Sequence, residues 1–188
     1  MSRIIAGQVA GRRLVPVKGD QTRPTTDRVK EALFSRLESW DALTDARVLD
    51  LFAGSGALGL EAASRGAATV TFVDKSPVAF AALTTNINTL SPNLAARVSS
   101  HRQNAATFLA GAERENYDLI LVDPPYDFGH EELNSLLPSI ASALAPDGVV
   151  MIERGKRSAE PNWPASLNGL KPRSYGETIL YFAERPLT

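Results

Sequence analysis

Short apolar runs alternate with longer segments of mixed character through most of the chain. After residue 46 the runs are five or six residues long and rich in Val, Leu and Ile, which is typical of buried strands. They predict strands at residues 48–52, 69–73, 117–122, 148–152 and 178–183, with a weaker strand at residues 97–102.

The segments between these runs carry helix start signals and apolar positions three or four residues apart. Ser76 is a candidate N-cap and Pro77 a candidate first helical residue, so a helix is predicted from there towards Leu90. Further helices are predicted through residues 60–63, 105–109 and 131–144, the last kinked or split by Pro138. An earlier helix is predicted by cap candidates at Thr25, Thr26 and Asp27 and by an apolar face of Val29, Ala32, Leu33, Leu37 and Trp40.

Strands that alternate with helices predict an α/β fold, with a mostly parallel sheet and helices on both faces. Ahead of this pattern, residues 3–6 and 13–17 are strand-like, and Gly7 and Gly11 flank the turn between them, which predicts a β-hairpin. The predicted organisation is a basic hairpin and loop at residues 1–24, followed by the main domain at residues 25–188.

Composition narrows the classes of protein. Apolar residues make up 44% of the chain and charged residues 22%, which is a globular balance. No apolar run approaches the roughly 20 residues of a membrane span, and the opening residues lack the apolar region of an export signal. The chain has no cysteine and only two isolated histidines, so we expect no disulfide, no metal centre and a cytosolic location.

Charge is unevenly distributed along the chain. Residues 1–30 contain seven basic and two acidic residues, a net charge of +5, whereas the other 158 residues contain 13 basic and 19 acidic residues, a net charge of −6. Such segregation is typical of a basic arm that binds a polyanion such as nucleic acid. A solvated surface without a partner accounts for the charge alone equally well.

A glycine-rich loop follows the first strand of the α/β pattern. Gly54, Gly56 and Gly59 match the spacing G-x-G-x-x-G at the start of a helix. Glycine lets the backbone approach a ligand closely, and a helix N-terminus offers free amide donors. Asp74 lies twenty residues after Gly54, at the end of the second strand, where a carboxylate can accept both hydroxyls of a ribose. The loop therefore predicts a cofactor that contains adenosine.

The loop and Asp74 fit a nicotinamide dinucleotide as well as S-adenosylmethionine. Asp50, four residues before Gly54, favours S-adenosylmethionine, because a dinucleotide site usually has only apolar residues there. A buried acid at this position suits a ligand with an ammonium group and a sulfonium nearby.

The fourth strand ends at Asp123-Pro124-Pro125-Tyr126, where ligands bind in open α/β sheets. Each proline fixes φ and restricts the residue before it, so the corner is stiff. It presents the Asp123 carboxylate, a neighbouring main-chain carbonyl and the flat ring of Tyr126. These groups suit a planar base with an exocyclic amine, whose lone pair they would direct at the methyl group. A Pro-Pro pair that merely ends a strand is the simpler explanation of the corner taken alone.

These motifs resemble those of class I amino-methyltransferases, at Asp50-Leu51-Phe52-Ala53-Gly54-Ser55-Gly56 and Asp123-Pro124-Pro125-Tyr126. The run from Arg23 to Phe34, RPTTDRVKEALF, resembles the signature of the bacterial 16S ribosomal RNA guanine-N2 methyltransferase family, and the resemblance covers essentially the whole chain. It implies a Rossmann-like, seven-stranded sheet with an antiparallel last strand, S-adenosyl-L-methionine as cofactor, and small-subunit rRNA or the assembling subunit as partner. It also implies a cytoplasmic enzyme, which we expect to be a monomer without membrane or metal partners.

The resemblance also implies roles for individual residues. Asp50 and Gly54 to Gly56 would contact the methionine part of the cofactor, Asp74 the ribose, and Asp123 with Pro124 and Tyr126 the target amine. The remaining cofactor contacts would come from Phe52, Ala53, Ser55, Gly59, Lys75, Ser76, Asn104 and Ala105. Many class I members have an acid where Ala105 stands, so the adenine contact would fall to Asn104 or the backbone.

Contacts to RNA are expected from the basic start of the chain and from the corner, at Arg3, Arg12, Arg13, Arg23, Arg28 and Pro125. Arg154, Lys156 and Arg157 are expected to extend this surface after the fifth strand. An alternative makes the hairpin a packed edge of the fold whose arginines are merely solvated.

Four other functions stay open at this point. One of them, a non-catalytic RNA-binding relative, is disfavoured by the intact run Asp123-Pro124-Pro125-Tyr126. Adenine-N6 and protein glutamine methylation use similar corners, although a protein substrate would not call for a basic arm. Guanine is slightly favoured over adenine, because it presents two adjacent donors to a carboxylate, N1–H and N2–H. A NAD-dependent oxidoreductase would share the glycine loop, but it gives the Pro-Pro corner no role and finds no hydride-site acid among the two histidines.

Overall fold

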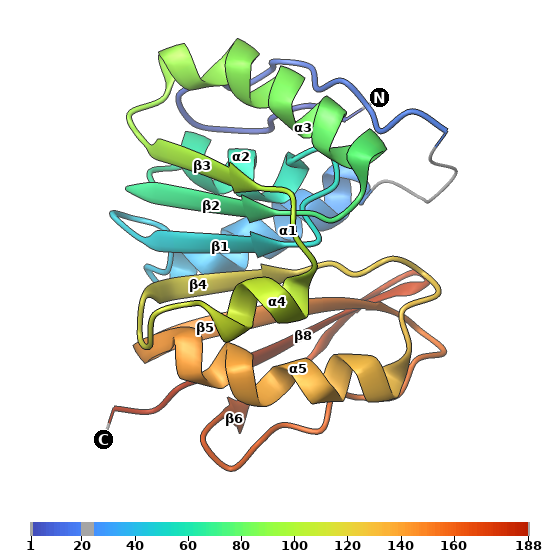
Figure 1. Cartoon of the computed structure of the whole chain (residues 1–188). Coiled ribbons are helices and arrows are strands. Elements are labelled where there is room, and N and C mark those ends of the chain that lie inside the picture. Colours follow the sequence, from blue (N-terminus) through green and yellow to red (C-terminus); the bar gives the residue numbers. More distant parts are fainter. Residues whose placement is uncertain (1, 20–24, 188) are drawn as a thin grey trace.

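Eight strands form one sheet in the computed structural model, which describes residues 2–19 and 25–187 (Figure 1). The order is β3-β2-β1-β4-β5-β8-β6, and β7 also pairs with β8. The strands are β1 (Arg47–Leu51), β2 (Thr69–Val73), β3 (Arg97–His101), β4 (Tyr117–Val122), β5 (Leu144–Gly155), β6 (Asn168–Gly169), β7 (Arg173–Tyr175) and β8 (Thr178–Glu184). The helices are α1 (Asp27–Ser39), α2 (Ala57–Ser64), α3 (Pro77–Leu90), α4 (Ala105–Ala110) and α5 (His130–Ala143), with a 3₁₀ turn at Ser91–Asn93.

The first five strands are parallel and β8 is antiparallel, as expected. Helices α1, α2 and α3 cover one face of the sheet with Leu, Val and Phe side chains, and α4 and α5 cover the other face. Because both faces are buried, the central strands β1 and β4 are almost wholly inaccessible to solvent. The parallel strands consequently direct their carboxyl ends to one edge of the molecule (Figure 1).

The edge beside β8 differs from the expected seven-stranded sheet because its outer strand is in two parts. The Leu170 amide bonds the Phe182 carbonyl, but Pro172 has no amide to donate. The pairing therefore stops after β6 and resumes at β7, on the same side of β8. Both parts are polar in sequence, so an interpretation based on apolar runs did not predict them as strands.

The predicted helix caps of α1 and α3 are confirmed. The Thr26 hydroxyl accepts the Val29 amide at 3.3 Å, and the Ser76 hydroxyl accepts the Ala79 amide at 3.3 Å ahead of Pro77. The expected split of the last helix is wrong, since α5 continues through Pro138. Pro138 is exposed, so its ring costs one backbone hydrogen bond on the solvent side without interrupting the helix.

The N-terminal segment (residues 2–19) folds back on itself, but a single bridge between Arg3 and Arg13 replaces the two expected strands. Some of its backbone donors bond within the segment, as the Ile4 amide does to the Arg12 carbonyl, but others bond outside it: the amides of Ile5 and Ala6 bond the Glu61 carboxylate, at 2.9 and 3.1 Å. Three of its apolar side chains, Ile4, Val9 and Leu14, are buried against the helices. Contacts with α2 therefore take the place of a regular hairpin ladder.

Glu61 of α2 is fully buried, and its carboxylate interacts with donors from three parts of the chain. Besides the two amides, its carboxylate accepts Arg65 Nε at 2.8 Å and lies 3.6 Å from the Lys30 ammonium of α1. Lys30 also donates to the Arg3 carbonyl. Burial lowers the pKa of Lys30, and the negative charge of Glu61 raises it. Lys30 is one of the seven basic residues counted among residues 1–30. Because it is only 1% exposed, it is unavailable to RNA.

Gly59 allows α2 to pack closely against the strands. A Cβ atom at this position would lie 2.3 Å from Phe72 Cε1 and 2.9 Å from Asp50 Oδ2. Real contacts of this kind do not occur, so any larger residue must push the helix away from β1 and β2. The lack of a side chain at Gly59 therefore sets how closely α2, the helix after the glycine loop, packs against the sheet.

We expect Gly59→Ala to lower the free energy of unfolding by about 1–3 kcal/mol, the usual cost of overpacking a core. The control is Gly111→Ala, where the nearest atom to an added Cβ is the Phe108 carbonyl oxygen at 3.8 Å. That variant should stay within about 0.5 kcal/mol of the wild type. Urea unfolding followed by circular dichroism measures both, and equal stabilities of the two variants would contradict the role of Gly59.

Candidate active site

The loops after β1, β2, β3 and β4 meet at the carboxyl edge of the sheet, on the right in Figure 1. Ligands of open α/β sheets bind at this edge, where the strand order reverses. Here the reversal falls between β1 and β4, which pair in parallel from Val48 and Leu119 onward. The glycine loop follows β1 and the Asp123 to Tyr126 corner follows β4, so the fold brings the two predicted motifs to neighbouring positions.

The glycine loop has the backbone conformation that a close approach to a ligand needs. Gly54 has φ +58° and Gly56 has φ +88°, both in the left-handed region that favours glycine. No atom lies within 4 Å of a Cβ built on Gly54, so the space in front of it is open. Gly56 is instead enclosed by Leu83 and Leu60 and serves as the N-cap of α2.

Asp74 is fixed by two main-chain amides. Its Oδ2 accepts the Gly54 amide at 2.9 Å, and its Oδ1 accepts the Ser76 amide at 2.9 Å. Each carboxylate oxygen can accept a second hydrogen bond, so both remain able to bind ribose hydroxyls. Lys75 is exposed beside it, and Ser76 caps α3.

Asp50 lies beneath the loop and is 1% exposed. Its Oδ2 accepts the Gly59 amide at 2.9 Å. Burial raises the pKa of Asp50 to about 7, the Gly59 hydrogen bond opposes this, and the negative charge of Asp74 adds to it. A positively charged ligand at this position would favour the ionised form of the acid.

The Asp123 to Tyr126 corner is a short, closed turn. Pro124 is buried, Tyr126 is 77% exposed, and the Phe128 amide bonds the Pro125 carbonyl at 3.0 Å. Behind the corner, Arg154 Nη2 donates to the Phe128 carbonyl at 2.8 Å. The half-buried Asp123 carboxylate interacts electrostatically with the Arg154 guanidinium.

Phe52 and Phe128 join the two motifs. Their rings pack edge to face with centroids 4.9 Å apart and an interplanar angle of 64°. Phe52 has φ +59°, which is uncommon for a residue with a Cβ and costs energy that the packing must offset. Ala53, next to it, is buried and bonds the Val73 carbonyl through its amide.

The loop after β3 carries Asn104 and Ala105, the expected neighbours of the adenine. Asn104 Oδ1 accepts the Ala106 amide at 2.8 Å, so this side chain caps α4. Ala105 is buried under the loop. The amide nitrogen of Asn104 and the backbone of this turn are therefore the groups that face outward.

Two residues at the site were not predicted from the sequence. Asn86 of α3 is 2% exposed, and its Nδ2 donates to the carbonyls of Val15 and Ser55, both at 2.9 Å. It thereby ties the N-terminal segment to the glycine loop. Glu153 ends the apolar run of β5, and its carboxylate accepts the Thr25 hydroxyl at 3.0 Å. An acid at the end of a buried strand is the same signal that identified Asp50 and Asp123.

The arginines expected at RNA lie in different settings. Arg12, Arg13 and Arg28 are exposed, and Arg3 forms an exposed ion pair with Asp27 at 3.0 Å. Arg23 lies outside the described residues. Arg154 was expected on the RNA surface, which is wrong, because it is 8% exposed and packs behind the corner.

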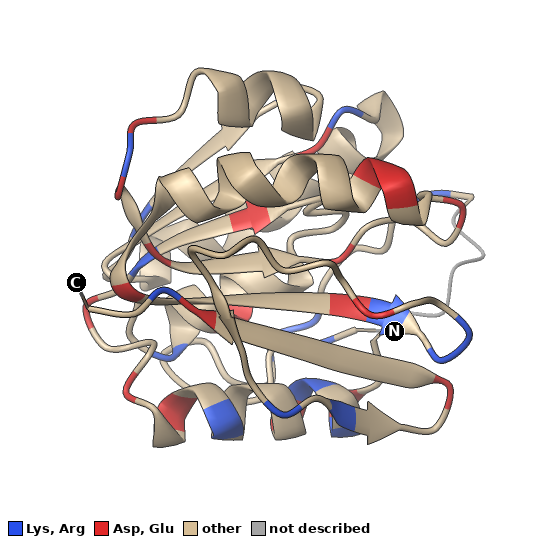
Figure 2. Ribbon diagram, turned by 90° about the horizontal axis from the view of Figure 1, so that it is seen from below, with Lys and Arg blue, Asp and Glu red and all other residues tan. Residues whose placement is uncertain are grey.

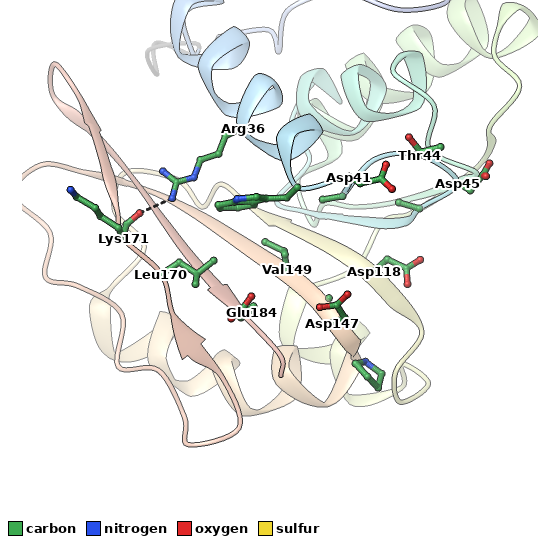
Figure 3. A pocket seen from close by; sticks show the side chains of 15 residues that line it. Arg36, Asp41, Thr44, Asp45, Asp118, Asp147, Val149, Leu170, Lys171 and Glu184 are labelled. Carbon is green, nitrogen blue, oxygen red and sulfur yellow. Dashed lines mark hydrogen bonds between the residues drawn. The ribbon is translucent and has the colours of Figure 1, made fainter. Parts of the chain in front are cut away.

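A cavity of about 710 Å³ lies at the opposite end of the strands (Figure 3). It opens beside Ala46 before β1, Asp118 at the start of β4 and Glu184 at the end of β8. None of the predicted cofactor or base residues lines it, and the chemistry described above lies at the other edge.

The chain is similar to known proteins in both sequence and structure. A family model described as conserved hypothetical protein 95 matches residues 2–184. The chain belongs to this family. Ribosomal RNA small subunit methyltransferase D of Escherichia coli strain K12 is 39% identical over 183 residues, which cover 97% of this chain and 89% of the relative. The solved structure of yhhF from Escherichia coli has a TM-score of 0.82 and 34% identity, and the match covers 100% of this chain and 99% of that chain.

The expected relationship to rRNA methyltransferases is thus confirmed, and so is the class I fold. Magnesium protoporphyrin IX methyltransferase from Synechocystis PCC 6803, solved with bound SAM, shares the fold at a TM-score of 0.65 and 17% identity, over 84% of this chain and 78% of that chain. Across residues 2–19 and 25–187, no helix is long and apolar enough to cross a membrane. The same residues contain no group of three or more His, Cys, Asp or Glu side chains that could hold a metal ion.

We expect S-adenosylmethionine binding to strengthen as the pH rises from about 5 to 7. With its pKa raised to about 7, Asp50 is largely protonated in this range, whereas a cationic ligand favours its ionised form. Binding should therefore release a proton, and affinity should rise by up to about tenfold per pH unit and level off above pH 7. Calorimetry in buffers of different ionisation enthalpy measures both quantities.

Asp50→Asn should bind the cofactor more weakly and lose this dependence on pH. Asp147→Asn, at the opposite end of the sheet, is the matched control and should keep it. A wild-type affinity that does not change with pH would exclude contact between Asp50 and the charged part of the cofactor.

Proposed function

We propose that the chain transfers a methyl group from S-adenosylmethionine to the exocyclic N2 amine of a guanine in small-subunit ribosomal RNA. The observation that carries the proposal is the junction of the glycine loop and the Asp123 to Tyr126 corner through Phe52 and Phe128. This contact sets the cofactor motif beside an amine-binding motif. The 39% identity to ribosomal RNA small subunit methyltransferase D of Escherichia coli supports the same reaction. The similarity to rRNA methyltransferases favours this reaction over the oxidoreductase alternative.

The residues of the carboxyl edge fit S-adenosylmethionine. Asp50 would face the charged methionine part, Asp74 would accept the ribose hydroxyls, and the open space before Gly54 would admit the ligand against the backbone. The cofactor would supply an electrophilic methyl group. The protein then has mainly to align an amine with that group, a task that depends on positioning more than on acid–base chemistry.

The corner would hold the target amine. The Asp123 carboxylate and the Pro124 carbonyl would each accept one amine hydrogen, which directs the nitrogen lone pair toward the methyl group and stabilises positive charge on nitrogen. Tyr126 is 77% exposed and would stack on a base extruded from its surroundings.

The N-terminal segment would bind the RNA backbone. It carries Arg3, Arg12, Arg13 and Lys18 and no acidic residue, while charges of both signs are scattered over the main domain (Figure 2). Arg12 and Arg13 are exposed above a body of buried apolar residues. Through Asn86 the segment is fixed to Ser55 of the glycine loop, so phosphate contacts there would lie at a set distance from the cofactor. A cytoplasmic, monomeric enzyme acting on rRNA or the assembling subunit completes the proposal.

Asp123→Ala should lower the rate of methyl transfer by at least about 100-fold, the usual effect of removing one transition-state hydrogen-bond partner. Affinity for S-adenosylhomocysteine should stay within about twofold, because cofactor contacts lie on other strands. The assay is mass spectrometry of nucleosides from small-subunit rRNA of cells that lack the chain, after treatment with each variant. N2-methylguanosine should appear with the wild type, and N6-methyladenosine in its place would refute the guanine assignment.

Replacing Arg12 and Arg13 by Ala should weaken RNA binding and flatten its salt dependence. Each lost phosphate contact should reduce the slope of log affinity against log salt by about 0.7–0.9. Arg3 is left in place because it pairs with Asp27. The control is Arg114→Ala with Lys171→Ala, two exposed residues at the amino end of the strands. Equal slopes for the two double variants would favour the account in which the arginines of the segment are only solvated.

A further inference from the structure

Glu153 is a carboxylate at the substrate edge of the sheet to which the mechanism above gives no task. It follows four buried apolar residues, Val149 to Ile152, near the end of β5. Strands β4 and β5 pair in parallel up to Val122 and Ile152. The next residues along the two chains are Asp123, just after β4, and Glu153, still within β5, so they follow paired positions of neighbouring strands about 4.8 Å apart.

The partners of Glu153 leave much of its hydrogen-bonding capacity unused. The Thr25 hydroxyl, with one hydrogen to donate, lies 3.0 Å from Oε2 and 3.2 Å from Oε1. Within the described part of the chain, no lysine or arginine forms an ion pair with this carboxylate, whereas Asp118 has one such partner and Glu61 has two. Burial raises the pKa of Glu153, and the Thr25 hydrogen bond opposes this. An ionised carboxylate can accept about four hydrogen bonds, so this half-buried one, with a single hydroxyl donor, keeps acceptor positions for a ligand.

The contact with Thr25 relates the Glu153 carboxylate to the rest of the site. Thr25 stands just before Thr26, the N-cap of α1, and within the predicted RNA-contacting stretch from Arg23 to Arg28. On the other side, Glu153 pairs with Leu180 of β8, so its backbone is held in the sheet. Glu153 is thus held through its backbone by β8 and through its carboxylate by Thr25, on the strand next to the one that leads into the corner that would hold the target amine.

We propose that Glu153 is the residue that selects guanine: its carboxylate accepts N1–H of the target base while Asp123 and Pro124 hold the N2 amine. This rests on the proposed function and names the group that reads the base. N1–H and N2–H are adjacent donors on one edge of guanine, and Asp123 and Glu153 are adjacent acceptors on one edge of the sheet. Adenine has an acceptor at N1, which a carboxylate would repel. Thr25 acts as a positioning residue for Glu153.

A base analogue separates this role from a structural one. 2-Aminopurine keeps the N2 amine but has no hydrogen on N1, so it offers the reacting group without the donor that Glu153 would read. The test compares kcat/KM for two ribosomal RNAs that differ only at the methylated nucleotide, which is guanine in one and 2-aminopurine in the other. The ratio of the two values does not depend on how much of a variant is folded, because both come from the same preparation.

The wild type should prefer guanine, and Glu153→Gln should lower that preference by about 10- to 100-fold, since Gln can donate to the bare N1. Glutamine also keeps an acceptor for the Thr25 hydroxyl, so the anchor survives. Glu184→Gln, the same change at the opposite end of the sheet, should leave the preference as in the wild type.

The outcomes distinguish a failure of the role of Glu153 from a failure of the proposed function. If the wild type methylates guanine and Glu153→Gln keeps the wild-type preference, Glu153 does not read the base and the proposal of this section is wrong. If the wild type does not methylate guanine at all, the proposed function itself fails, and the wild-type measurement alone reveals it.

Discussion

The buried carboxylate of Glu61 is the interaction on which the arrangement of the site depends. It joins the amides of Ile5 and Ala6, the Lys30 ammonium of α1 and the Arg65 guanidinium of α2 in one cluster. A charge at such depth is tolerated only because every side of it is occupied by a donor, and loss of one charged partner from such a cluster typically costs about 3–5 kcal/mol. Helix α1 and the N-terminal segment are thus held by the same atoms, and α1 begins beside Thr25, which contacts Glu153.

Acidic side chains at the ends of four adjacent strands give the site its electrostatic character. Asp74, Asp50, Asp123 and Glu153 follow or end β2, β1, β4 and β5, which are consecutive in the sheet. The sheet thereby offers a row of acceptors to ligands that are rich in N–H and O–H donors or positive charge, as S-adenosylmethionine and a guanine edge are. The phosphates of RNA would be repelled by this row, whereas the N-terminal segment carries exposed arginines and no acidic residue.

The features that could be predicted from the sequence are those fixed by local rules. The Gly54 loop, the Thr26 and Ser76 caps and the buried strands follow from backbone preferences and apolar runs, and the structure has them where they were expected. The features that were missed depend on distant partners. The hairpin strands are absent because the Ile5 and Ala6 amides bond Glu61, and Arg154 is buried because a carbonyl from the loop after β4 is within its reach. The roles of individual site residues remain predictions, since neither the fold nor the relatives test them.

The contacts of the N-terminal segment also have a consequence for the order of folding. The hydrogen bonds that fix it to the main domain include three that join residues 55 to 71 positions apart, from Ile5 and Ala6 to Glu61 and from Val15 to Asn86. Such long-range contacts form only after the intervening chain is in place, because closing a long loop costs entropy before the contact compensates for it. During synthesis, the N-terminal segment leaves the ribosome before α2 and α3 and therefore remains without these partners until both helices have been made. A nascent enzyme would thus acquire its candidate RNA-binding segment late, after the helices beside the cofactor loop have formed.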